Sequence, residues 1–466
     1  MPSHSERVIV QKFGGTSVYP MENLLSSARC VIRAIHQGWI PVVVVSAPGR
    51  KGDPYATDTL KKLAEDINPQ VPVKPRELDL LMTCGEIISI VLMAQAIRVL
   101  GGYDTIALTG GQAGIYTDYE FGNAAILEID TRYIRRCLRE GKIPIVAGFQ
   151  GVTKRISEGE YVHGAITTLG RGGSDTTATA LGKALGAQLV EIYTDVDGVM
   201  TADPKIVGGR AKRHESLAYE ELSELAHLGA RVVHPRAVEI AHESMTPIFV
   251  RSTEATSVGT RVDKPLKELG DGFHRITGIT QSAPVVHFKI EVERESDLPE
   301  VEMLVYRALG DCKISVHFNV RFRRGFEFVI NRDAMAQALQ VLDGLPIKVS
   351  GGGRKRIYVL SANSSGDTFS VKLCMLRESL KHAEEQPELK VTRMEVGANK
   401  VTVSIVAPNV REHPEVLARA LEALLRAKIE VFQVSDADHS LSFLVYEEDA
   451  VKAVSVLHHE FFERAQ

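Results

Sequence analysis

The chain has 466 residues, of which 44% are hydrophobic and 24% are charged, and its formal net charge at pH 7 is −4. This length predicts about two to four domains, each able to bury a core, and the composition is typical of a soluble globular protein. The charge gives no electrostatic reason to expect nucleic acid or an anionic membrane as a partner.

Up to residue 262, short apolar strands alternate with helical patterns. The strand candidates are residues 8–10, 42–45, 105–108, 143–146, 189–193 and 248–250, and the helix candidates include residues 24–36, 87–100 and 131–140. Continuous apolar runs are typical of parallel strands that are covered on both faces. We therefore expect an α/β fold with a mainly parallel central sheet over residues 1–265.

The first loop with candidate chemistry is Lys12-Phe13-Gly14-Gly15-Thr16-Ser17, which follows the strand at residues 8–10. Two glycines allow the backbone to approach an anion, and Lys12 offers a point charge for phosphate oxygens. The spacing is not that of a Walker loop. A plain turn explains the same residues, so both interpretations stay open at this point.

The second loop is residues 170–177, which lead into an alanine-rich helix at residues 178–185. Its glycines expose backbone N–H groups beside the positive end of the helix, an arrangement that suits a phosphate. Arg171 lies between two glycine turns and adds a planar fork that matches a carboxylate or a phosphate. Ordinary helix capping does not account for this arginine, so we favour a functional role.

The third loop is residues 193–205, where Asp195, Asp197 and Asp203 lie close in sequence to Lys205. Asp-Gly and Asp-Pro pairs are routine turn signals. Carboxylates beside a lysine also suit a site for a nucleotide with magnesium. The residues themselves leave the two interpretations open.

After residue 265 a strand–helix–strand–strand–helix order appears twice, as in the ferredoxin-like plan of many small-ligand modules. We expect one such module at residues 280–350 and a second at residues 398–466, with an insert or partial module at residues 351–397. Glycine and serine clusters at residues 351–353 and 363–367 mark loops between them.

Together these motifs resemble the aspartokinase family over about residues 7–262. The matching segments are residues 12–18 (KFGGTSV), 45–47 (VSA), 84–86 (CGE), 148–151 (GFQG), 168–175 (TLGRGGSD), 194–199 (TDVDGV), 201–204 (TADP) and 229–235 (GARVVHP). The resemblance implies an amino-acid-kinase fold and transfer of the γ-phosphate of ATP to the side-chain carboxylate of L-aspartate. The product would be 4-phospho-L-aspartate, at the entry to lysine, threonine and methionine synthesis.

The resemblance also implies roles for individual residues. Lys12 and Asp175 would be catalytic, with Asp175 orienting lysine and magnesium. The nucleotide would be held by Lys12, Phe13, Gly14, Gly15, Ser46, Ser174, Thr194, Asp195, Met200, Lys205 and Arg231. Aspartate would be held by Glu86, Arg171, Gly172, Gly173 and Ser174.

Some positions depart from the family pattern. Pro48 replaces a usual methionine and Gly52 a frequent substrate-binding threonine, so Arg50, Asp53 or Thr57 would take over that contact. Lys205 and Arg231 each exchange one cation for the other, which keeps the charge but alters donor geometry.

The trailing modules look like the ACT domains of the family, which implies an amino-acid effector and a homodimer or higher homo-oligomer. They lack the usual Pro-Gly turn before the first helix, and His317 stands where an acidic residue is common. A lone histidine at this spacing is more often a packed or surface residue than a ligand.

Cofactor and location follow from the same resemblance. ATP would carry Mg²⁺, and no protein residue is assigned as a metal ligand. Five separated cysteines, none in a C-x-x-C pair, argue against a disulfide framework or a zinc site. No secretory signal stands at the N-terminus and no apolar segment approaches the roughly 20 residues that cross a bilayer, so we expect a cytoplasmic enzyme with no membrane partner.

Two alternatives remain. A kinase of the same fold could act on glutamate, N-acetylglutamate, carbamate or a nucleotide, but Glu86 suits a free ammonium group that acylated substrates lack. A non-catalytic sensor could bind an amino acid through the ACT-like modules, but the presence of Lys12, Arg171 and Asp175 disfavours a decayed kinase.

Overall fold

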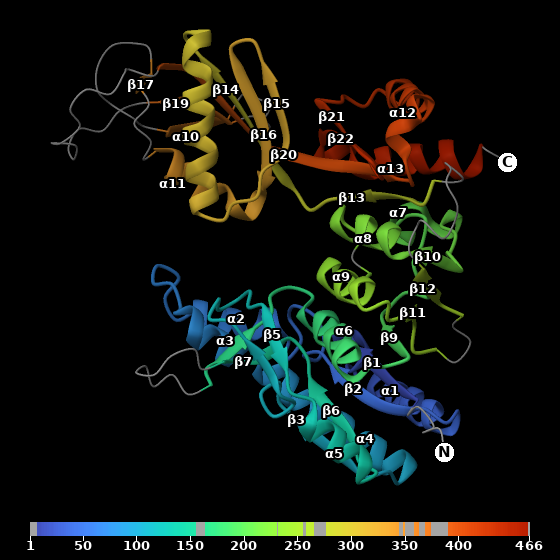
Figure 1. Ribbon diagram of the computed structural model, residues 1–466. Helices are drawn as coiled ribbons and strands as arrows, with labels where there is room; N and C mark the ends of the chain where they lie inside the picture. Colours follow the sequence, from blue (N-terminus) through green and yellow to red (C-terminus); the bar gives the residue numbers. More distant parts are fainter. Residues whose placement is uncertain are drawn as a thin grey trace. The chain divides into compact units, whose positions relative to one another are not determined.

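The computed structural model describes residues 7–154, 164–230, 232–254, 258–264, 276–343, 348–349, 358–362, 369–373 and 390–464. The chain divides into two compact units (Figure 1). The first unit comprises Met1–Thr201 and Gly209–Gly272, and the second comprises Ala202–Gly208 and Phe273–Gln466. A short segment of the predicted nucleotide loop therefore belongs to the second unit.

A mainly parallel sheet forms the centre of the first unit. Its strands lie in the order β10 (Ser216–Ala218), β12 (Thr260–Lys264), β11 (Ile248–Arg251), β9 (Leu189–Tyr193), β1 (Val8–Phe13), β2 (Ile40–Val45), β6 (Ile143–Ala147) and β3 (Thr105–Leu108). All neighbouring pairs are parallel except β11 with β12. The expected α/β fold is confirmed, and the apolar strands are buried as the sequence predicts.

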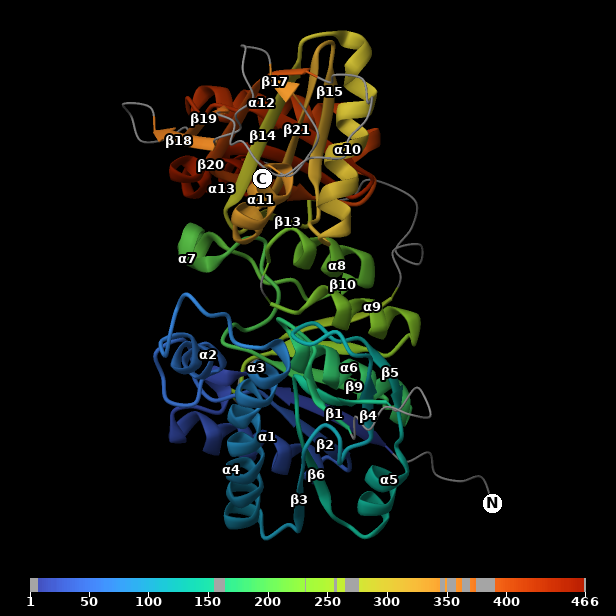
Figure 2. The same cartoon turned by 90° about the vertical axis from the view of Figure 1, so that its left-hand side faces the viewer.

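Helices cover both faces of this sheet (Figure 2). On one face, α1 (Met21–His36) and α4 (Cys84–Gly101) pack their apolar sides on Phe13, Val43 and Val45. On the other, α6 (Gly173–Leu185) contacts β1, β2 and β9. The remaining helices of the unit are α2 (Thr57–Glu65), α3 (Pro75–Met82), α5 (Arg132–Arg139), α8 (Tyr219–His227) and α9 (Pro235–Glu243).

A smaller sheet stands beside the main one and carries the approach to the second loop. Its order is β5 (Ile126–Ile129), β4 (Ile115–Thr117), β7 (Gln150–Thr153) and β8 (Ile166–Thr168). Strand β8 ends directly before residues 169–173, so this sheet sets the starting point of that loop.

One segment differs from the expectation about membranes. Residues Pro75–Gly101, which span α3 and α4, are long and apolar enough to cross a bilayer by length and composition. Half of the qualifying window is buried inside the protein. Its buried residues Ile90, Met93 and Ile97 pack in the core of the first unit.

The second unit is built on a ten-stranded sheet. Its main path runs β15 (His317–Phe322), β16 (Gly325–Asn331), β14 (Val285–Val292), β20 (Lys390–Val406), β19 (Phe369–Leu373) and β18 (Tyr358–Ala362). Off this path, β20 also pairs with β13 (Gly278–Gln281), β17 (Lys348–Val349) and β22 (Ser440–Tyr446), and β22 pairs with β21 (Gln433–Ala437).

The helices complete the predicted repeat of strand, helix, two strands and helix. They are α10 (Leu298–Asp311) and α11 (Met335–Asp343) in the first copy, and α12 (Pro414–Arg426) and α13 (Ala450–His458) in the second. The short α7 (Pro204–Val207) also belongs to this unit and contacts α13. The predicted boundary between residues 397 and 398 falls inside β20, which pairs with strands of both copies.

The sequence pattern predicts strands at residues 314–320 and 429–434, whereas β15 begins at His317 and β21 at Gln433, three and four residues later. Lys313 and Lys428 adopt left-handed conformations, each with φ of 56°. The next N–H groups, of Ile314 and Ile429, then donate to the helix carbonyls of Leu309 and Leu424. Residues that look like strand in the sequence are therefore part of a Schellman-type helix end.

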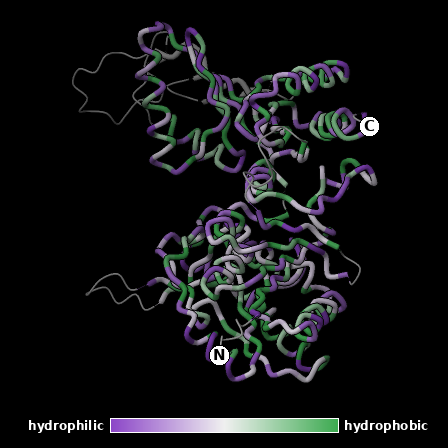
Figure 3. The backbone as a smooth tube through the Cα atoms, turned by 45° about the vertical axis from the view of Figure 1, so that its right-hand side comes forward, coloured by the Kyte–Doolittle hydropathy of each residue, from purple (hydrophilic) through white to green (hydrophobic). Residues whose placement is uncertain are grey.

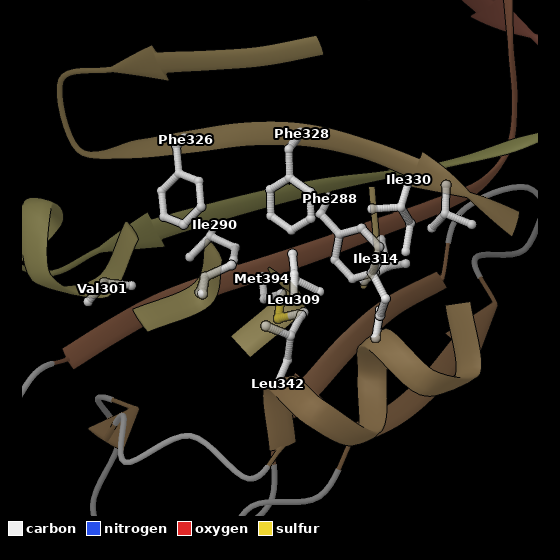
Figure 4. Packing of buried hydrophobic residues seen from close by; sticks show 14 of the residues in the cluster. Phe288, Ile290, Val301, Leu309, Ile314, Phe326, Phe328, Ile330, Leu342 and Met394 are labelled. Carbon is white, nitrogen blue, oxygen red and sulfur yellow. The ribbon is translucent and has the colours of Figure 1, made fainter. Parts of the chain in front are cut away.

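The core of the first copy lies between α10, α11 and the sheet (Figure 4). Phe288 and Phe328 stack with ring centroids 5.0 Å apart, and Leu309 and Met394 pack with them. Hydrophobic and hydrophilic residues are interspersed along the chain in both units, as amphipathic elements require (Figure 3). The glycine and serine loops predicted at residues 351–353 and 363–367 lie outside the described residues.

Candidate active site

The carboxyl ends of the central strands lie at one level of the sheet. In the parallel register, Phe13 is level with Val45 and with Tyr193, and Val45 is level with Ala147. The loops that follow β1, β2, β6 and β9 therefore leave the sheet at the same edge, which is where open α/β sheets bind ligands. The motif at residues 168–175 reaches the same edge from β8 of the smaller sheet, where Asp175 contacts Lys12 and Ser174 lies against Gly148.

At this edge Lys12 forms a buried ion pair with Asp175. Lys12 Nζ lies 2.7 Å from Asp175 Oδ1. The other carboxylate oxygen, Oδ2, accepts the backbone N–H of His234 at 3.1 Å. Two predicted catalytic residues separated by 163 positions in sequence numbering thus lie in direct contact. The paired lysine is held in place for an anionic partner.

Helix α6 begins five residues earlier than predicted, at Gly173 rather than at residue 178. Gly172 precedes it in the left-handed conformation, with φ of 70°. The hydroxyl of Thr177 donates to the carbonyl of Gly173 at 2.8 Å, so a residue that disfavours helices is accommodated inside this one. The earlier start places Ser174 and Asp175 in the first turn, beside the positive helix end.

Glu86 is a buried carboxylate in the first turn of α4. Its side chain is 2% exposed, and Oε1 accepts the N–H of Ala47 at 2.9 Å. The second oxygen, Oε2, is buried without a hydrogen-bond partner among the described residues. Burial raises the pKa of this carboxyl to about 8, although the N–H of Ala47 opposes the change. A buried carboxylate with an open oxygen suits an ammonium group.

Glycines allow these loops to approach closely. A Cβ on Gly15 would lie 2.5 Å from the carbonyl oxygen of Gly49 and 2.8 Å from that of Ala47. A Cβ on Gly148 would lie 2.7 Å from Ser174 Oγ. The first predicted loop is therefore packed against the loop after β2, and the loop after β6 against the start of α6.

The loop after β2 contacts the loop after β9. Arg50 and Asp195 form an ion pair of 2.5 Å between partly exposed side chains. Burial alone would raise the pKa of Asp195, but the hydrogen bond and charge of Arg50 lower it below its ordinary value. Asp53 accepts the N–H of Arg50 at 2.7 Å and so closes its own turn, while Thr57 begins α2.

Other predicted residues take different positions. Phe13 is fully buried, and its ring stacks on that of Tyr193 with centroids 4.6 Å apart. Ser46 donates its N–H to the carbonyl of Phe13, and Gly14 donates its own to the carbonyl of Tyr193. The N–H of Thr194 is bonded to the carbonyl of Arg251.

The rest of the third loop is divided between the two units. Met200 lies in the first unit and bridges to Arg213. Lys205 lies in the second unit, in α7. The side chain of Asp203 caps this helix by accepting the backbone N–H of Lys205. Arg171 is exposed, and no side-chain pairing holds it within the part of the chain that the structure describes. Arg231 lies outside the described residues.

His234 is a site residue to which the sequence pattern assigned no role. A Cβ on Gly172 would lie 2.3 Å from the His234 ring, and the backbone N–H of His234 donates to Asp175. Burial lowers the pKa of His234 below its ordinary value of 6.5, against the opposing charge of Asp175. The only signal in the sequence was its place before a proline at a helix start, in the segment at residues 229–235.

The site fits a magnesium ion that arrives on a nucleotide. In the part of the chain that the structure describes, no group of three or more His, Cys, Asp or Glu side chains is placed to hold a metal. Asp175 and Asp195 are each paired with a cation. These residues fit a divalent ion ligated mainly by phosphate oxygens, as is common for Mg²⁺.

Comparisons with known proteins agree with this geometry. Residues 7–252 match the amino acid kinase family, and residues 403–461 match the ACT domain. The chain is 36% identical over 458 residues to aspartokinase 1 of Bacillus subtilis, covering 98% of this chain and 99% of that protein. It is 39% identical over 460 residues to the aspartokinase of Geobacillus stearothermophilus, covering 97% of each.

A solved structure has the same fold. Aspartokinase III of E. coli in complex with aspartate and ADP superposes with a TM-score of 0.73 at 22% identity. The match covers 98% of this chain and 100% of that chain. Both units therefore have counterparts in one known architecture.

Proposed function

The chain belongs to the aspartokinases of the amino acid kinase family, and we propose that the strand-end site of its first unit transfers the γ-phosphate of ATP to the side-chain carboxylate of L-aspartate. The product is 4-phospho-L-aspartate, the first intermediate of lysine, threonine and methionine synthesis. The observation that carries the assignment to a free amino acid is the open, buried oxygen of Glu86. An acylated substrate has no ammonium group to place there.

The reaction requires no general base. A carboxylate with a pKa near 4 is already ionised at pH 7. One of its oxygens attacks the γ-phosphorus while the bond from that phosphorus to the β–γ bridging oxygen breaks, and ADP leaves. Both reactants are anionic, so charge neutralisation and alignment are the main demands on the protein.

The residues at the strand ends meet these demands. We assign Lys12 and the first turn of α6 to the transferring phosphate, and Gly14 and Gly15 to close backbone approach. Asp175 holds Lys12 in position through the 2.7 Å contact and is an organiser, not a proton acceptor. A magnesium ion on the nucleotide would supply further neutralisation of phosphate charge.

Glu86 and Arg171 are assigned to the two charged groups on the α-carbon of aspartate. Glu86 receives the ammonium group at its open oxygen, and Arg171, which is exposed and unpaired among the described residues, receives a carboxylate. For the nucleotide we retain Ser46, Thr194, Asp195, Met200, Lys205 and Arg231, and for the substrate loop Gly172, Gly173 and Ser174.

The test is trapping of the acyl phosphate as a hydroxamate. Purified protein receives ATP, Mg²⁺ and, in separate reactions, L-aspartate, L-glutamate, N-acetylglutamate and carbamate. We expect product with L-aspartate alone. Folded protein that binds ATP and gives no product with any acid would overturn the assignment, and product with N-acetylglutamate would refute the role of Glu86.

We further propose an amino-acid effector at the ACT-like second unit and a homo-oligomeric, cytoplasmic enzyme. The support is the ACT match at residues 403–461 and the repeated fold of this unit. Lysine, threonine and diaminopimelate, added separately to the hydroxamate assay, test the effector. Light scattering tests the oligomer, and a monomer at all concentrations would contradict that part.

A further inference from the structure

Asp79 is a buried carboxylate in α3 that none of the roles above uses. Its side chain is 1% exposed. Oδ2 accepts the backbone N–H of Gly122 at 2.9 Å and that of Thr168 at 2.8 Å, and Oδ1 accepts the Thr168 hydroxyl at 2.8 Å. One side chain thus joins three segments that are 43 and 89 residues apart in sequence.

The two sides of this junction lead directly to the two proposed aspartate-binding groups. Through the single residue Thr83, α3 continues into α4, whose first turn carries Glu86. The N–H of Thr83 is bonded to the carbonyl of Asp79 at 3.1 Å, so the link is continuous. On the other side, Thr168 ends β8 and stands three residues before Arg171.

The turn at Gly122 packs against the loop that carries Arg171. A Cβ on Gly170 would lie 2.7 Å from Asn123 Oδ1 and 3.3 Å from the carbonyl oxygen of Gly122. The next residue, Ala124, donates its N–H to the carbonyl of Thr168 at 2.8 Å. The carboxylate therefore holds both the strand that enters the loop and the turn on which the loop rests.

We propose that Asp79 is a positioning residue for the amino-acid substrate, fixing the loop that carries Arg171 relative to the helix that carries Glu86. It does not contact substrate. The proposal rests on the function proposed above, because it assigns those two residues to aspartate. Misplacement of a binding group by about 1 Å is enough to reduce turnover by up to two orders of magnitude.

Two substitutions separate positioning from general stability. Asp79→Ala removes all three hydrogen bonds. Asp79→Asn keeps them if the amide oxygen accepts both N–H groups and the amide nitrogen donates to Thr168, whose hydroxyl rotates. We expect Asp79→Ala to raise the KM for aspartate about tenfold or more and the KM for ATP less than about threefold. We expect Asp79→Asn to restore the aspartate KM to within about threefold of the unmodified protein.

Asp118 lies in the β4–β5 connection that also contains Gly122. Asp118→Ala is therefore a control for loosening this connection while its bond to Asp79 of α3 is kept. Asp118 Oδ1 accepts the N–H groups of Glu120 and Ala125, each at 3.1 Å, and so closes only a local turn. Asp118→Ala should leave the aspartate KM within about twofold. If Asp79→Ala does not fold, Thr168→Val, which removes the hydroxyl bond alone, should still raise the aspartate KM above that of Asp118→Ala.

Amide hydrogen exchange gives a readout that does not depend on activity. In Asp79→Ala, and not in Asp118→Ala, the amides of residues 168–173 should exchange about tenfold faster. Folded Asp79→Ala with an unchanged aspartate KM and unchanged exchange would overturn the proposal, as would equal losses for aspartate and ATP. Absence of product from aspartate in the unmodified protein would overturn the proposed function alone, and the exchange comparison would still decide whether Asp79 positions the loop.

Discussion

At the scale of single residues, the site contains two buried carboxylates in opposite situations. Asp175 is paired with Lys12 at 2.7 Å, so its charge is compensated inside the protein. Glu86 has one open oxygen and a pKa raised to about 8 by burial, so its charged form is stabilised when a cation such as an ammonium group binds. The paired carboxylate of Asp175 suits a role in organising the site, whereas the open oxygen of Glu86 suits binding of the substrate.

The raised pKa of Glu86 predicts a pH dependence of aspartate binding. Below pH 8 the carboxyl is mostly protonated, and the ammonium group of aspartate requires it ionised. The apparent Kd for aspartate should therefore fall roughly fivefold to tenfold between pH 7 and pH 8.5. Calorimetric titration measures this change, and Glu86→Gln should bind weakly with no such dependence. A Kd that is flat over this range in the unmodified protein would contradict the assignment.

Ionisation of Glu86 strengthens aspartate binding as the pH rises, but it lowers the folding stability of the protein. A folded-state pKa of about 8 lies above the ordinary value of 4.5, so the folded protein holds this proton more tightly than the unfolded chain. The resulting stabilisation is fully present below pH 4.5 and is lost as the pH rises towards 8. At pH 8.5, Glu86→Gln should therefore unfold at a temperature no lower than the unmodified protein, although it has lost substrate affinity.

Replacement of Lys12 tests the charge at the transferring phosphate. Lys12→Met removes the cation and leaves Asp175 buried without its ion-pair partner. We expect kcat to fall about 10²-fold to 10³-fold, as when one transition-state donor is removed. Lys12→Arg keeps the charge but not the geometry and should recover only part of the rate. Steady-state kinetics at saturating ATP measures both, and an unchanged kcat in Lys12→Met would contradict the role.

At the scale of secondary-structure elements, β20 (Lys390–Val406) determines how the second unit is built. Its first half pairs with β14 of one copy, and its second half pairs with β22 of the other. The sequence repeat suggests two modules separated by an insert or partial module at residues 351–397, but hydrogen bonding continues through the predicted boundary at residues 397 and 398. The two copies therefore share a strand.

A shared strand predicts that the two copies unfold together. Phe288 lies in the core of the first copy and Phe443 pairs with β20 in the second, and both are fully buried. Phe288→Ala and Phe443→Ala should each cost about 3–5 kcal/mol and should lower the same calorimetric transition. Met303→Ala, at a residue that is 46% exposed, is the surface control. Separate transitions for the two copies would refute the prediction.

At the scale of the whole molecule, the chain forms two units, and one short segment within the first belongs to the second. Residues Ala202–Gly208 leave the first unit and join the second, where α7 contacts α13. The predicted nucleotide segment from Met200 to Lys205 therefore includes residues of both units. Each unit has its own core, so a ligand that is held by one unit should raise the unfolding transition of that unit.

Ligand-dependent unfolding tests this division. ADP with Mg²⁺, at about 100 times its Kd, should stabilise the first unit by about 2.7 kcal/mol, and aspartate should add to this effect. An amino-acid effector should raise the transition of the second unit instead. Hydrogen exchange assigns each transition to its residues. If aspartate protected only the second unit, it would be bound as an effector and not as a substrate.

The sequence by itself determined the α/β class, the mainly parallel central sheet and the ACT-like repeat, and it predicts that the glycine loops share one site. It did so because apolar periodicity and glycine turns are local signals that survive without tertiary context. The predicted strand starts at Ile314 and Ile429 were wrong, because these apolar residues are part of the preceding helix ends.

Tertiary structure alone decided which polar groups are satisfied. Burial and register are not local. The sequence therefore could not show that Glu86 keeps one oxygen open, that the backbone N–H of His234 donates to Asp175, or that Asp79 joins α3 to β8. It also could not show that Asp53 is engaged within its own turn, because that depends on how the loop closes. Local patterns name the residues of the site, whereas their charges, partners and distances follow from packing.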